Sequence, residues 1–543
     1  MASVSPPDLA RPIPLHEQPQ IHSRRWFLLA MMCLSLVLVV MSVSGLVTAI
    51  PTMQEELHAS ASQVQWILDA YAVVFAGTLL TAGALGDRFG RKRALLTGLV
   101  VFGAGAFFAG IASSASQVIA GRAVMGIGAA LVMPATLSII TTIFPPEERS
   151  RAIAVWAGFA GAGGALGPIV SGALLENFWW GSAVLVNLPI VAAVFLAIWA
   201  FAPESRDENE TPLDPVGAVL SLVGLSALVF GIIQGGEDGW TSTPVVGAFA
   251  VAIAAIAGFL SWERRSSHPM LPLEFFKNRR FSMGAGVITI AFFVMFGFFF
   301  LTTQYLQFAR GFSPLEAGLA LLPLPIMFVA FSPRSAVLAE RYGAPRVMAS
   351  GLVIVAGGFV MLSLLSPGTP YLLIALAYAV LGIGMSVTAA PATGEIMSAV
   401  PLSKAGVGSA VNDTTRELGG ALGIAILGSI ANSAYRSGID LSGIGLAGTP
   451  RGNAEDSIGA AVGVASQAPG GAGTEVKVRA AQAFTDAFNL AMAVSVGLAL
   501  VAAAAVILFA RPRRERTDEV PVEDLAEELD WALVPVGAGE RSE

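Results

Sequence analysis

The sequence has few charged residues, few histidines and one cysteine. Only 13% of its 543 residues are Asp, Glu, Lys or Arg, whereas a soluble protein carries about 25%. The four scattered histidines exclude a histidine-based metal cluster, and the lone Cys33 excludes a disulfide framework. With a mean hydropathy of +0.71, the shortage of charge places the chain among membrane proteins.

Long apolar segments replace the missing charge. A membrane-spanning helix needs about 20 apolar residues, and fourteen segments are candidates for such helices. They cover residues 27–49, 63–85, 94–112, 117–143, 152–175, 182–202, 215–234, 244–262, 281–308, 315–338, 347–366, 371–393, 405–434 and 486–510. We therefore expect an all-α polytopic protein of the cell membrane.

Lysine and arginine gather in the even-numbered connections between these segments. The short odd-numbered connections hold none, with Arg310 as the exception. By the positive-inside rule, both termini are cytoplasmic, and the number of spans is even. Residues 23–27 resemble a twin-arginine export signal, but the apolar run that follows is longer than a signal core, which favours a first membrane helix.

The segments fall into a 6 + 2 + 6 arrangement. We expect a disordered cytoplasmic N-terminus at 1–24, a six-helix half at 25–202, a linker with two extra transmembrane helices at 203–280, a second six-helix half at 281–510 and a cytoplasmic tail at 511–543. The Gly/Ala/Ser-rich stretch 435–485 is expected to be a mobile loop on the outer side.

A charged hairpin between the second and third segments reads Gly83-Ala-Leu-Gly-Asp-Arg-Phe-Gly-Arg-Lys-Arg93, and a weaker copy covers 336–346. Its glycines allow a tight turn, and its Asp can accept hydrogen bonds from a helix N-terminus or an Arg. Such a contact can be made in one conformation and lost in another, although an ordinary positive-inside loop is the alternative. The predicted latch comprises Gly83, Asp87, Arg88, Gly90, Arg91, Glu340 and Arg341.

With this hairpin, the chain resembles the major facilitator superfamily. The stretch Gly163-Gly-Ala-Leu-Gly-Pro-Ile-Val-Ser-Gly172 is similar to the antiporter motif of its exporters, matching at Gly163, Gly167, Pro168 and Gly172. Arg122 matches the intramembrane arginine that this family links to proton coupling. The fourteen segments and their layout narrow the resemblance, which covers about 25–510, to the 14-helix drug:proton antiporter branch.

The first segment departs from that branch. The branch carries an Asp nine residues before the proline that ends helix 1, and Ser42 stands at this position ahead of Pro51. The branch's helix-1 Asn falls at Val47. The missing carboxylate puts a simple coupling scheme, and a preference for dicationic drugs, in doubt.

Charged residues inside spans are costly and therefore functional candidates. Asp69 lies in the outer part of the second segment, where it could exchange protons or merely make a polar contact. Asp413 and Glu417 share a helix face with Arg416 beside them, either as proton carriers or as a structural salt bridge. Glu395 faces either the cavity or the headgroups. The proton-coupling candidates are Asp69, Arg122, Asp413, Glu417 and Glu395.

Polar and aromatic residues within the spans are candidates for a substrate cavity. They are Tyr71, Trp156, Asn187, Gln304, Tyr305 and Gln307, although aromatic residues in spans are more often packing or interface residues. The phenylalanine-rich run 292–300 is expected to be packing surface.

The favoured function is a proton-coupled exporter of amphipathic small molecules such as antibiotics, dyes or antiseptics. A dedicated exporter of an endogenous metabolite or lipid-linked precursor remains the alternative. A receptor would need a sizeable output domain, and no catalytic motif, metal-ligand spacing or phosphate loop suggests an enzyme or a cofactor. We expect a proton gradient as the energy source, a monomer in the bilayer, small molecules and protons as partners, and no nucleic acid.

Overall fold

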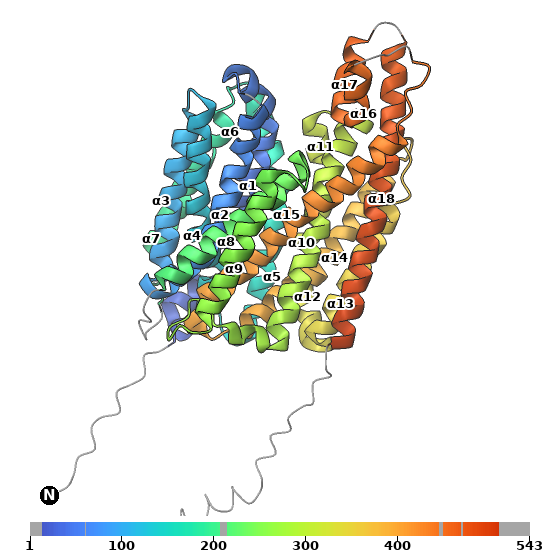
Figure 1. Ribbon diagram of the computed structural model, residues 1–543. Coiled ribbons are helices and arrows are strands. Elements are labelled where there is room, and N and C mark those ends of the chain that lie inside the picture. The colour runs from blue at the N-terminus through green and yellow to red at the C-terminus, as the bar shows by residue number, and fades with distance from the viewer. Residues whose placement is uncertain (1–13, 60, 207–213, 445–448, 469–470, 510–543) are drawn as a thin grey trace, which may run out of the picture. The chain divides into compact units, whose positions relative to one another are not determined.

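The structure is a computed structural model that describes residues 14–509 apart from 60, 207–213, 445–448 and 469–470. Its regular elements are helices, and no strand occurs in these ranges. Of these, residues 14–507 form one compact unit. The long helices of this unit run side by side as a bundle (Figure 1).

The first part of the chain builds one six-helix group. A short 3₁₀ turn, η1 (Leu15–Glu17), precedes it, and the break between α6 and α7 divides what the sequence predicted as one segment. The helices are α1 (Pro19–Glu56), α2 (Ala61–Phe89), α3 (Arg91–Gly110), α4 (Ala115–Ile143), α5 (Pro146–Leu175), α6 (Ser182–Leu185) and α7 (Asn187–Phe201).

Two inserted helices and a second group follow. The insert is α8 (Pro215–Asp238) and α9 (Thr243–Glu263), and η2 (Leu273–Lys277) leads out of it. The second group comprises α10 (Arg279–Gln304), η3 (Tyr305–Ala309), α11 (Pro314–Ala320), α12 (Pro323–Tyr342), α13 (Ala344–Leu362), α14 (Tyr371–Ser398), η4 (Leu402–Lys404), α15 (Ala405–Gly438), α16 (Thr449–Asp456), α17 (Ile458–Gln467) and α18 (Ala472–Phe509).

The two groups have matching internal contacts. In the first group α1 packs on α5, α2 on α4 and α3 on α4; in the second, α10 packs on α15, α12 on α14 and α13 on α14. The contacts between the groups match too, because α2 meets α15 and α12 meets α5. Each second helix of one group thus packs on the fifth long helix of the other.

Apolar packing follows the same division. One buried cluster draws mainly on the first group, including Leu36, Phe102 and Trp156. The other draws on the second group and on the insert, through Leu225 and Phe259. In water, burial of such clusters is the main favourable contribution to folding. Between membrane helices, close van der Waals packing of the same side chains stabilises the association instead.

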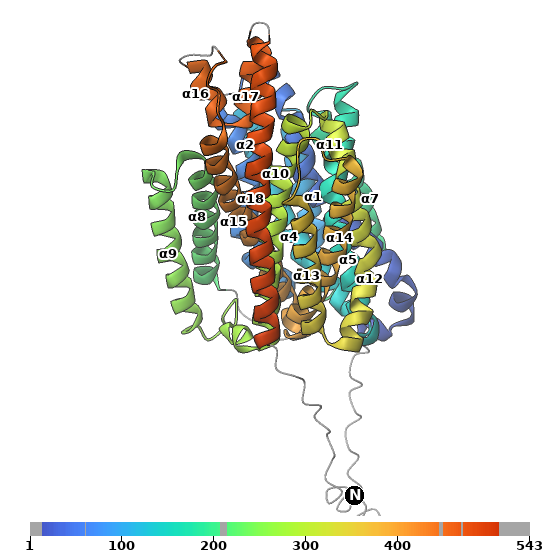
Figure 2. The same cartoon turned by 90° about the vertical axis from the view of Figure 1, so that its right-hand side faces the viewer.

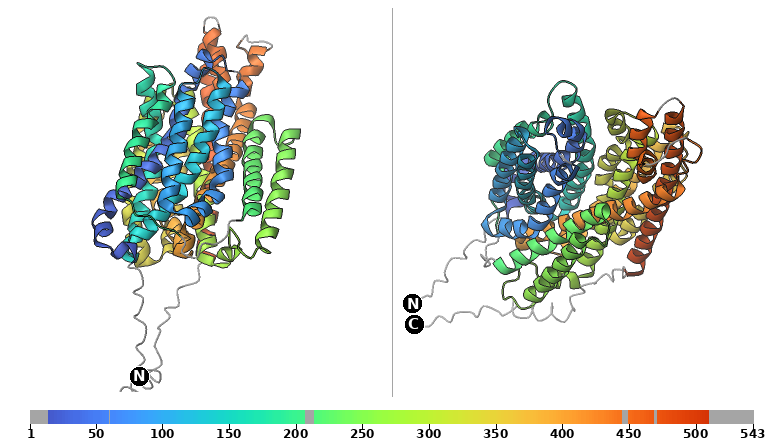
Figure 3. Two further views of the ribbon diagram at one scale, coloured as in Figure 1. Left: turned by 90° about the vertical axis from the view of Figure 1, so that its left-hand side faces the viewer. Right: turned by 45° about the horizontal axis from the view of Figure 1, so that its top comes forward.

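The insert stands against the seam between the groups. Helix α8 contacts both α2 and α15, whereas α9 packs on α8 (Figures 2 and 3). The hydroxyl of Ser226 in α8 donates to the carbonyl of Val73 in α2 at 3.2 Å, and Phe230 stacks on Trp66. The insert is therefore bound along the length of α2.

Thirteen described helical segments are long and apolar enough to cross a membrane. Helix α5 covers the remaining predicted segment, and its part Leu166–Leu175 is a shorter apolar helix. A multi-pass, all-α membrane protein is thus confirmed, while the count of fourteen, the cytoplasmic termini and the division into halves stay predictions. The predicted disordered N-terminus and the tail lie largely outside the described residues.

The stretch 435–485 differs from the mobile loop that its composition predicted. Helix α15 continues to Gly438, α18 begins at Ala472, and α16 and α17 lie between them at the top of Figure 1. Two pairs at helical i,i+4 spacing, Arg451–Glu455 and Arg479–Glu475, support these helices. Alanine, which favours helices, is as frequent in this stretch as glycine.

One end of the bundle gathers the basic residues. Arg25 at the start of α1 pairs with Glu148 at the start of α5, and Lys92 after the hairpin donates to the carbonyl of Trp199 at the end of α7. We call this the basic end, and the end with α16 and α17 the far end.

Candidate functional site

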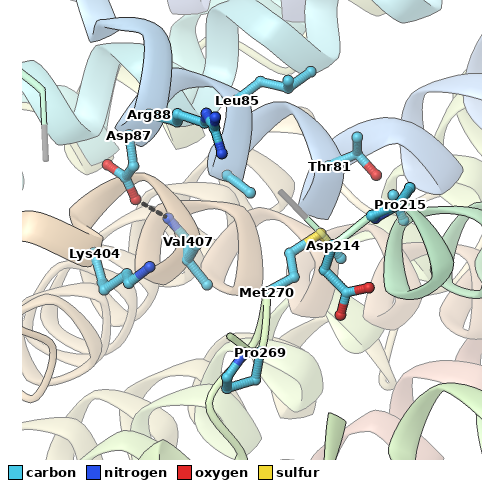
Figure 4. Close-up of a pocket in the computed structure, with 12 residues that line it drawn as sticks. Thr81, Leu85, Asp87, Arg88, Asp214, Pro215, Pro269, Met270, Lys404 and Val407 are labelled. Carbon is cyan, nitrogen blue, oxygen red and sulfur yellow. Dashed lines mark hydrogen bonds between the residues drawn. The ribbon is translucent and has the colours of Figure 1, made fainter. Parts of the chain in front are cut away.

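Asp87, near the end of α2, is bonded to the first turn of α15. Its carboxylate accepts hydrogen bonds from the backbone N–H groups of Gly406 and Val407 at 2.9 and 3.0 Å, the second of which Figure 4 shows. It also accepts from the Arg91 guanidinium at 2.8 and 3.1 Å. The N–H groups of a first helical turn lack partners in their own helix and carry partial positive charge. Both donor types that the sequence suggested for this carboxylate therefore lie beside it.

Two glycines let α2 and α15 approach closely here. A Cβ atom on Gly83 would lie 2.5 Å from the carbonyl oxygen of Gly406, and one on Gly406 would lie 2.6 Å from the carbonyl oxygen of Gly83. Neither position has room for a side chain. Arg91 adds a hydrogen bond to the carbonyl of Leu402 at 2.5 Å, so one buried ion pair and several backbone groups hold the two helices together.

The turn between α2 and α3 depends on Gly90. Its φ of 111° lies in the region that favours glycine, and a Cβ atom there would lie 2.5 Å from the Glu204 carboxylate. That carboxylate accepts from the backbone N–H of Lys92 at 3.0 Å. Residue 204 begins the linker toward the insert, so the hairpin also anchors the linker.

The second copy of the hairpin is placed differently. Glu340 and Arg341 are exposed at the end of α12, and within the described residues Glu340 has no ion pair or hydrogen bond. The turn itself is preserved, because Gly343 has a φ of 86°. Only the first hairpin therefore joins the two groups through its acid.

A second set of charges lies inside the bundle, at Arg122 in α4. Its side chain is 1% exposed, and its Nε donates to the carbonyl of Ile67 at 3.1 Å. Its guanidinium carbon lies 4.4 Å from the centre of the Tyr71 ring, a cation–π contact. Two further guanidinium nitrogens have no protein partner. The sequence suggested a carbonyl or Asp69 as the partner, and the structure supplies a carbonyl and an aromatic face.

Asp413 and Arg416 in α15 are also buried. The Arg416 guanidinium lies 3.9 Å from a carboxylate oxygen of Asp413, and the Asn412 amide donates to the same oxygen at 3.2 Å. The other oxygen of Asp413 is buried without a partner. Arg416 packs over the rings of Phe292 in α10 and Trp156 in α5, at 4.8 and 5.4 Å. It thus contacts an aromatic residue from each six-helix group.

Tyr71 connects these two sets. Glu417, which follows Arg416, lies within electrostatic range of Tyr71, and Ser42 of α1 lies next to the same phenol. The Tyr71 ring already contacts Arg122. Arg122 of the first group and Asp413, Arg416 and Glu417 of the second therefore form one assembly of charges, in which Glu417 is half-buried and the other three are buried. Together with Tyr71 we call it the central cluster: Tyr71, Arg122, Asp413, Arg416 and Glu417. Ser42 contributes a hydroxyl at its edge where the related branch has a carboxylate.

The two other acidic candidates are placed differently from each other. Asp69 is half-buried in α2, two residues after the carbonyl that accepts from Arg122. Glu395 lies near the basic end, where its carboxylate is 3.7 Å from Arg280.

The antiporter-like stretch packs α5 against α1. A Cβ atom on Gly163 would meet Val40 at 2.9 Å, and one on Gly167 would meet the backbone N of Gly45 at 2.5 Å. A Cβ atom on Gly318 in α11 would lie 3.5 Å from Pro168. A Cβ atom on Gly172 would lie 4.0 Å from the side chain of Leu315, also in α11. The first two glycines thus permit close helix packing, whereas the last two face α11.

The suggested cavity residues separate into three places. Tyr71 and Trp156 belong to the central cluster or adjoin it, and the Trp156 indole donates to Thr136 at 3.2 Å. Asn187 is buried in the first group and donates to the carbonyl of Val184 at 2.8 Å. The remaining three, Gln304, Tyr305 and Gln307, lie where α10 passes into the π-helical turn η3.

Two features of the cluster were missed by sequence reasoning. Phe292 belongs to a run read as packing surface, yet it lies over a buried arginine. Asn412 was not among the candidates, yet its carbonyl oxygen accepts from Thr393 at 3.0 Å while its amide donates to Asp413. The available signal was the polar run Asn412–Glu417 inside an apolar segment. The described residues hold no group of His, Cys, Asp and Glu suited to a metal ion.

Comparison with known proteins supports the resemblance. A family model described as the Major Facilitator Superfamily matches residues 32–424. The multidrug efflux pump LfrA of Mycolicibacterium smegmatis is 37% identical over 486 residues, covering 89% of this chain and 96% of that protein. The tetracenomycin C resistance and export protein of Streptomyces glaucescens is 31% identical, with 92% and 95% covered. The methyl viologen resistance protein SmvA of Salmonella typhimurium is 32% identical, with 91% and 99% covered.

A solved structure shows the same fold. The human organic anion transporter MFSD10 superposes with a TM-score of 0.58 over 89% of this chain and 99% of that chain, at 14% identity. At that identity the match concerns the fold alone. Since the family model covers most of the chain and relatives match nearly its full length, the chain belongs to the major facilitator superfamily and is a multi-pass membrane transporter, not an enzyme.

Proposed function

We propose that this transporter exports amphipathic small molecules from the cell in exchange for protons. The observation that carries the proposal is the central cluster, in which the buried Arg122 of the first group lies together with the buried Asp413 and Arg416 and the half-buried Glu417 of the second group. Buried charge is costly in a membrane and marks functional sites by default. The relatives' names, which include multidrug efflux and export with resistance, support the direction and the type of substrate.

Protons and substrate would meet at the acids of this cluster. Asp413 keeps one carboxylate oxygen without a protein partner, so it can accept a proton or bind a cationic group. Glu417 lies beside Tyr71, which in turn contacts Arg122. Protonation removes negative charge and leaves both arginines less balanced, which changes the relative free energies of the conformations. The proton gradient would then drive export without a cofactor.

Alternating access would proceed by movement of the two groups about the cluster. Arg416 touches aromatic residues of both groups, so such movement would alter its surroundings directly. The Asp87 contacts would close the basic end in one state and release it in the other. Close packing of α1 on α5 at Gly163 and Gly167 would let these helices move together.

Transport into proteoliposomes with an imposed pH gradient tests this proposal. We expect Glu417→Gln and Asp413→Asn to lose at least about 90% of the pH-driven flux, because each removes a proton site. The matched control is Asp486→Asn, an exposed acid on α18, which should keep wild-type flux. Unchanged flux in both cluster variants would refute the assignment. For Asp69→Asn, unchanged flux at every pH would remove that residue from the scheme.

The alternative, a dedicated exporter of an endogenous metabolite or lipid-linked precursor, retains one specific argument. Ser42 stands where the related branch has a carboxylate, and its hydroxyl donates to the carbonyl of Val39 at 2.8 Å. A pump-deficient host that expresses this chain should survive better against part of a dye and antibiotic panel, and an uncoupler should abolish that protection. Protection against no compound would favour the dedicated exporter.

A further inference from the structure

The two inserted helices meet at the basic end through a pair of buried acids. Asp214, the residue before α8, is 9% exposed, and Glu263, the last residue of α9, is 4% exposed. Neither acid belongs to the central cluster or to the Asp87 contacts, and neither takes part in the proposed export. Because buried charge is costly unless it is paired, two buried acids side by side call for a physical account.

The two carboxylates converge on Gly217 in the first turn of α8. A Cβ atom on Gly217 would lie 2.7 Å from Oδ2 of Asp214 and 2.8 Å from Oε1 of Glu263. Asp214 also lies within electrostatic range of Glu263. The glycine therefore leaves room for one oxygen of each acid to approach the other.

The hydrogen-bond donors around these acids are unevenly shared. The backbone N–H of Gly217 donates to Oδ1 of Asp214 at 2.8 Å, and the Trp262 indole donates to both oxygens of Asp214 at 2.8 and 2.9 Å. The backbone N–H of Leu271 donates to Oε2 of Glu263 at 3.1 Å. Within the described part of the chain, Oε1 of Glu263 is buried and has no hydrogen-bond partner. The oxygen without a partner is thus the one that approaches Asp214.

We propose that Asp214 and Glu263 bind one proton between them, carried on Oε1 of Glu263 and donated to Oδ2 of Asp214. A protonated carboxyl has one O–H donor, so the proton gives Oε1 a hydrogen bond to make. It also removes one of two like charges, and two carboxylates at one site resist being ionised together. The proton comes from the aqueous side at the basic end, where both acids lie.

The cations of the neighbouring elements do not balance this pair. Among the described residues, neither acid forms an ion pair with a lysine or an arginine. Figure 4 shows the Asp214 carboxylate directed away from the other charged residues of the adjacent cavity, which are Asp87, Arg88 and Lys404. The charged or titratable residues that follow α9 are exposed: Arg264, Arg265, His268 and Glu274. A proton therefore supplies what these cations do not.

The shared proton joins three parts of the insert. Asp214 precedes α8, Glu263 ends α9, and Leu271 belongs to the segment that leads into the second group. Asp214 and Met270 also line the cavity beside the Asp87 contacts. Loss of the proton would leave two adjacent buried charges and loosen this corner. The attachment of the inserted helices would then depend on the pH at the basic end.

Infrared difference spectroscopy of the full-length protein in lipid vesicles tests the proton directly. A protonated carboxylic acid has a carbonyl band of its own, and part of that band should disappear from the wild type as the pH is raised from 5 to 9. Glu263→Gln should lack this part of the band, because it removes the group that carries the proton. Glu274→Gln is the matched control, since it changes an exposed acid shortly after the insert, and it should keep the band.

Thermal unfolding of the same variants gives a second readout. The unfolded chain releases both protons from about pH 4 upward, whereas the folded protein keeps one. Stability therefore falls as the pH rises from there to the pH at which the pair releases its proton. The amide of Glu263→Gln donates to Asp214 at every pH. Its unfolding temperature should fall less between pH 5 and 9 than that of the control, by at least about 1 °C.

Three results would overturn the proposal. The first is an unchanged band in Glu263→Gln, and the second is the same pH dependence of unfolding in Glu263→Gln and the control. The third is stabilisation of the wild type by Mg²⁺ or Ca²⁺ at pH 8 that Glu263→Gln abolishes, because the ligand would then be a metal ion. If Glu263→Gln does not fold, Asp214→Asn serves instead: its amide would donate to Oε1 of Glu263 in place of the proton, so the same part of the band should be lost. Because neither measurement involves transport, failure here is distinguishable from failure of the proposed export.

Discussion

The two hairpins, 83–93 and 336–346, occupy equivalent places in the two groups but make different contacts. Both follow the second long helix, both turn at a glycine with positive φ, and both helices pack on the fifth helix of the opposite group. Yet Asp87 is 3% exposed and bonded to α15, whereas Glu340 is exposed to solvent. A repeated sequence pattern therefore does not imply a repeated contact.

The partner helices explain the difference. Helix α15 begins with residues whose backbone N–H groups are available, and Gly406 and Val407 give theirs to Asp87. Helix α5 begins at Pro146 after the N-cap Pro145, neither of which has an N–H group, and its first turn carries Glu147 and Glu148. Acids in a first turn already satisfy the positive end of a helix. They would repel a further carboxylate such as Glu340.

The largest expected effect breaks the first contact. Asp87→Ala leaves the buried Arg91 guanidinium and two N–H groups of α15 without their acceptor, and breaking a buried charge pair costs about 3–5 kcal/mol. We expect export in proteoliposomes to fall by more than about 90% and the free energy of unfolding to fall by this order. Glu340→Ala is the control, and it should change stability by less than about 0.5 kcal/mol, as exposed substitutions do. Similar losses in both variants would show that the hairpins act alike after all.

A smaller effect is expected when the close approach of α2 and α15 is disturbed and the Asp87 ion pair is left intact. Gly83→Ala places a Cβ atom 2.5 Å from the carbonyl oxygen of Gly406, and overpacking of this kind costs about 1–3 kcal/mol. Gly86→Ala is the matched control, because its Cβ atom would meet only Ala94, at an ordinary 3.5 Å. Cysteine cross-linking of α2 to α15 should be weakened in the first variant only. Equal cross-linking in both would contradict the need for a glycine at this approach, where the second hairpin carries Ala336.

Much of the fold could be predicted from the sequence, since span length and charge distribution act locally. Runs of apolar residues located the long helices, although α1 and α18 begin well before the predicted segments 27–49 and 486–510. The glycine-rich hairpin marked a sharp turn. Residues 435–485 were misjudged because a high content of glycine, alanine and serine reads as flexible, whereas much of the stretch forms the end of α15, α16, α17 and the start of α18. Composition alone does not say which of these tendencies prevails.

The candidate site was predictable only where one helix fixes it. Asp413 and Arg416 are three residues apart, so their pairing follows from helical geometry. Contacts between the groups have no such rule, because Asp87 and Gly406 are 319 positions apart. The stacking of Arg416 between Phe292 and Trp156 likewise needs three helices in place.

The smallest expected effect tests the acid-rich start of α5. The Arg25 guanidinium donates to Glu148 at 2.7 and 3.0 Å, and this hydrogen bond lowers the pKa of the Glu148 carboxyl. A lowered pKa adds stability above the unfolded value near 4.5, and that stability is lost as the pH falls through the folded value. Because the pair is partly exposed, the contribution is under about 1 kcal/mol.

Glu148→Gln should therefore lower the unfolding temperature slightly at pH 7 and leave it unchanged near pH 3. Thermal unfolding of the purified protein between these pH values measures the difference, with Glu147→Gln as the neighbouring control in the same helical turn. A loss of the same size at both pH values would mean that packing, and not charge, is responsible. If instead the Glu340 carboxylate bonded to the start of α5 in the Glu148→Gln variant, the acids of that turn would be what keeps the second hairpin away from α5.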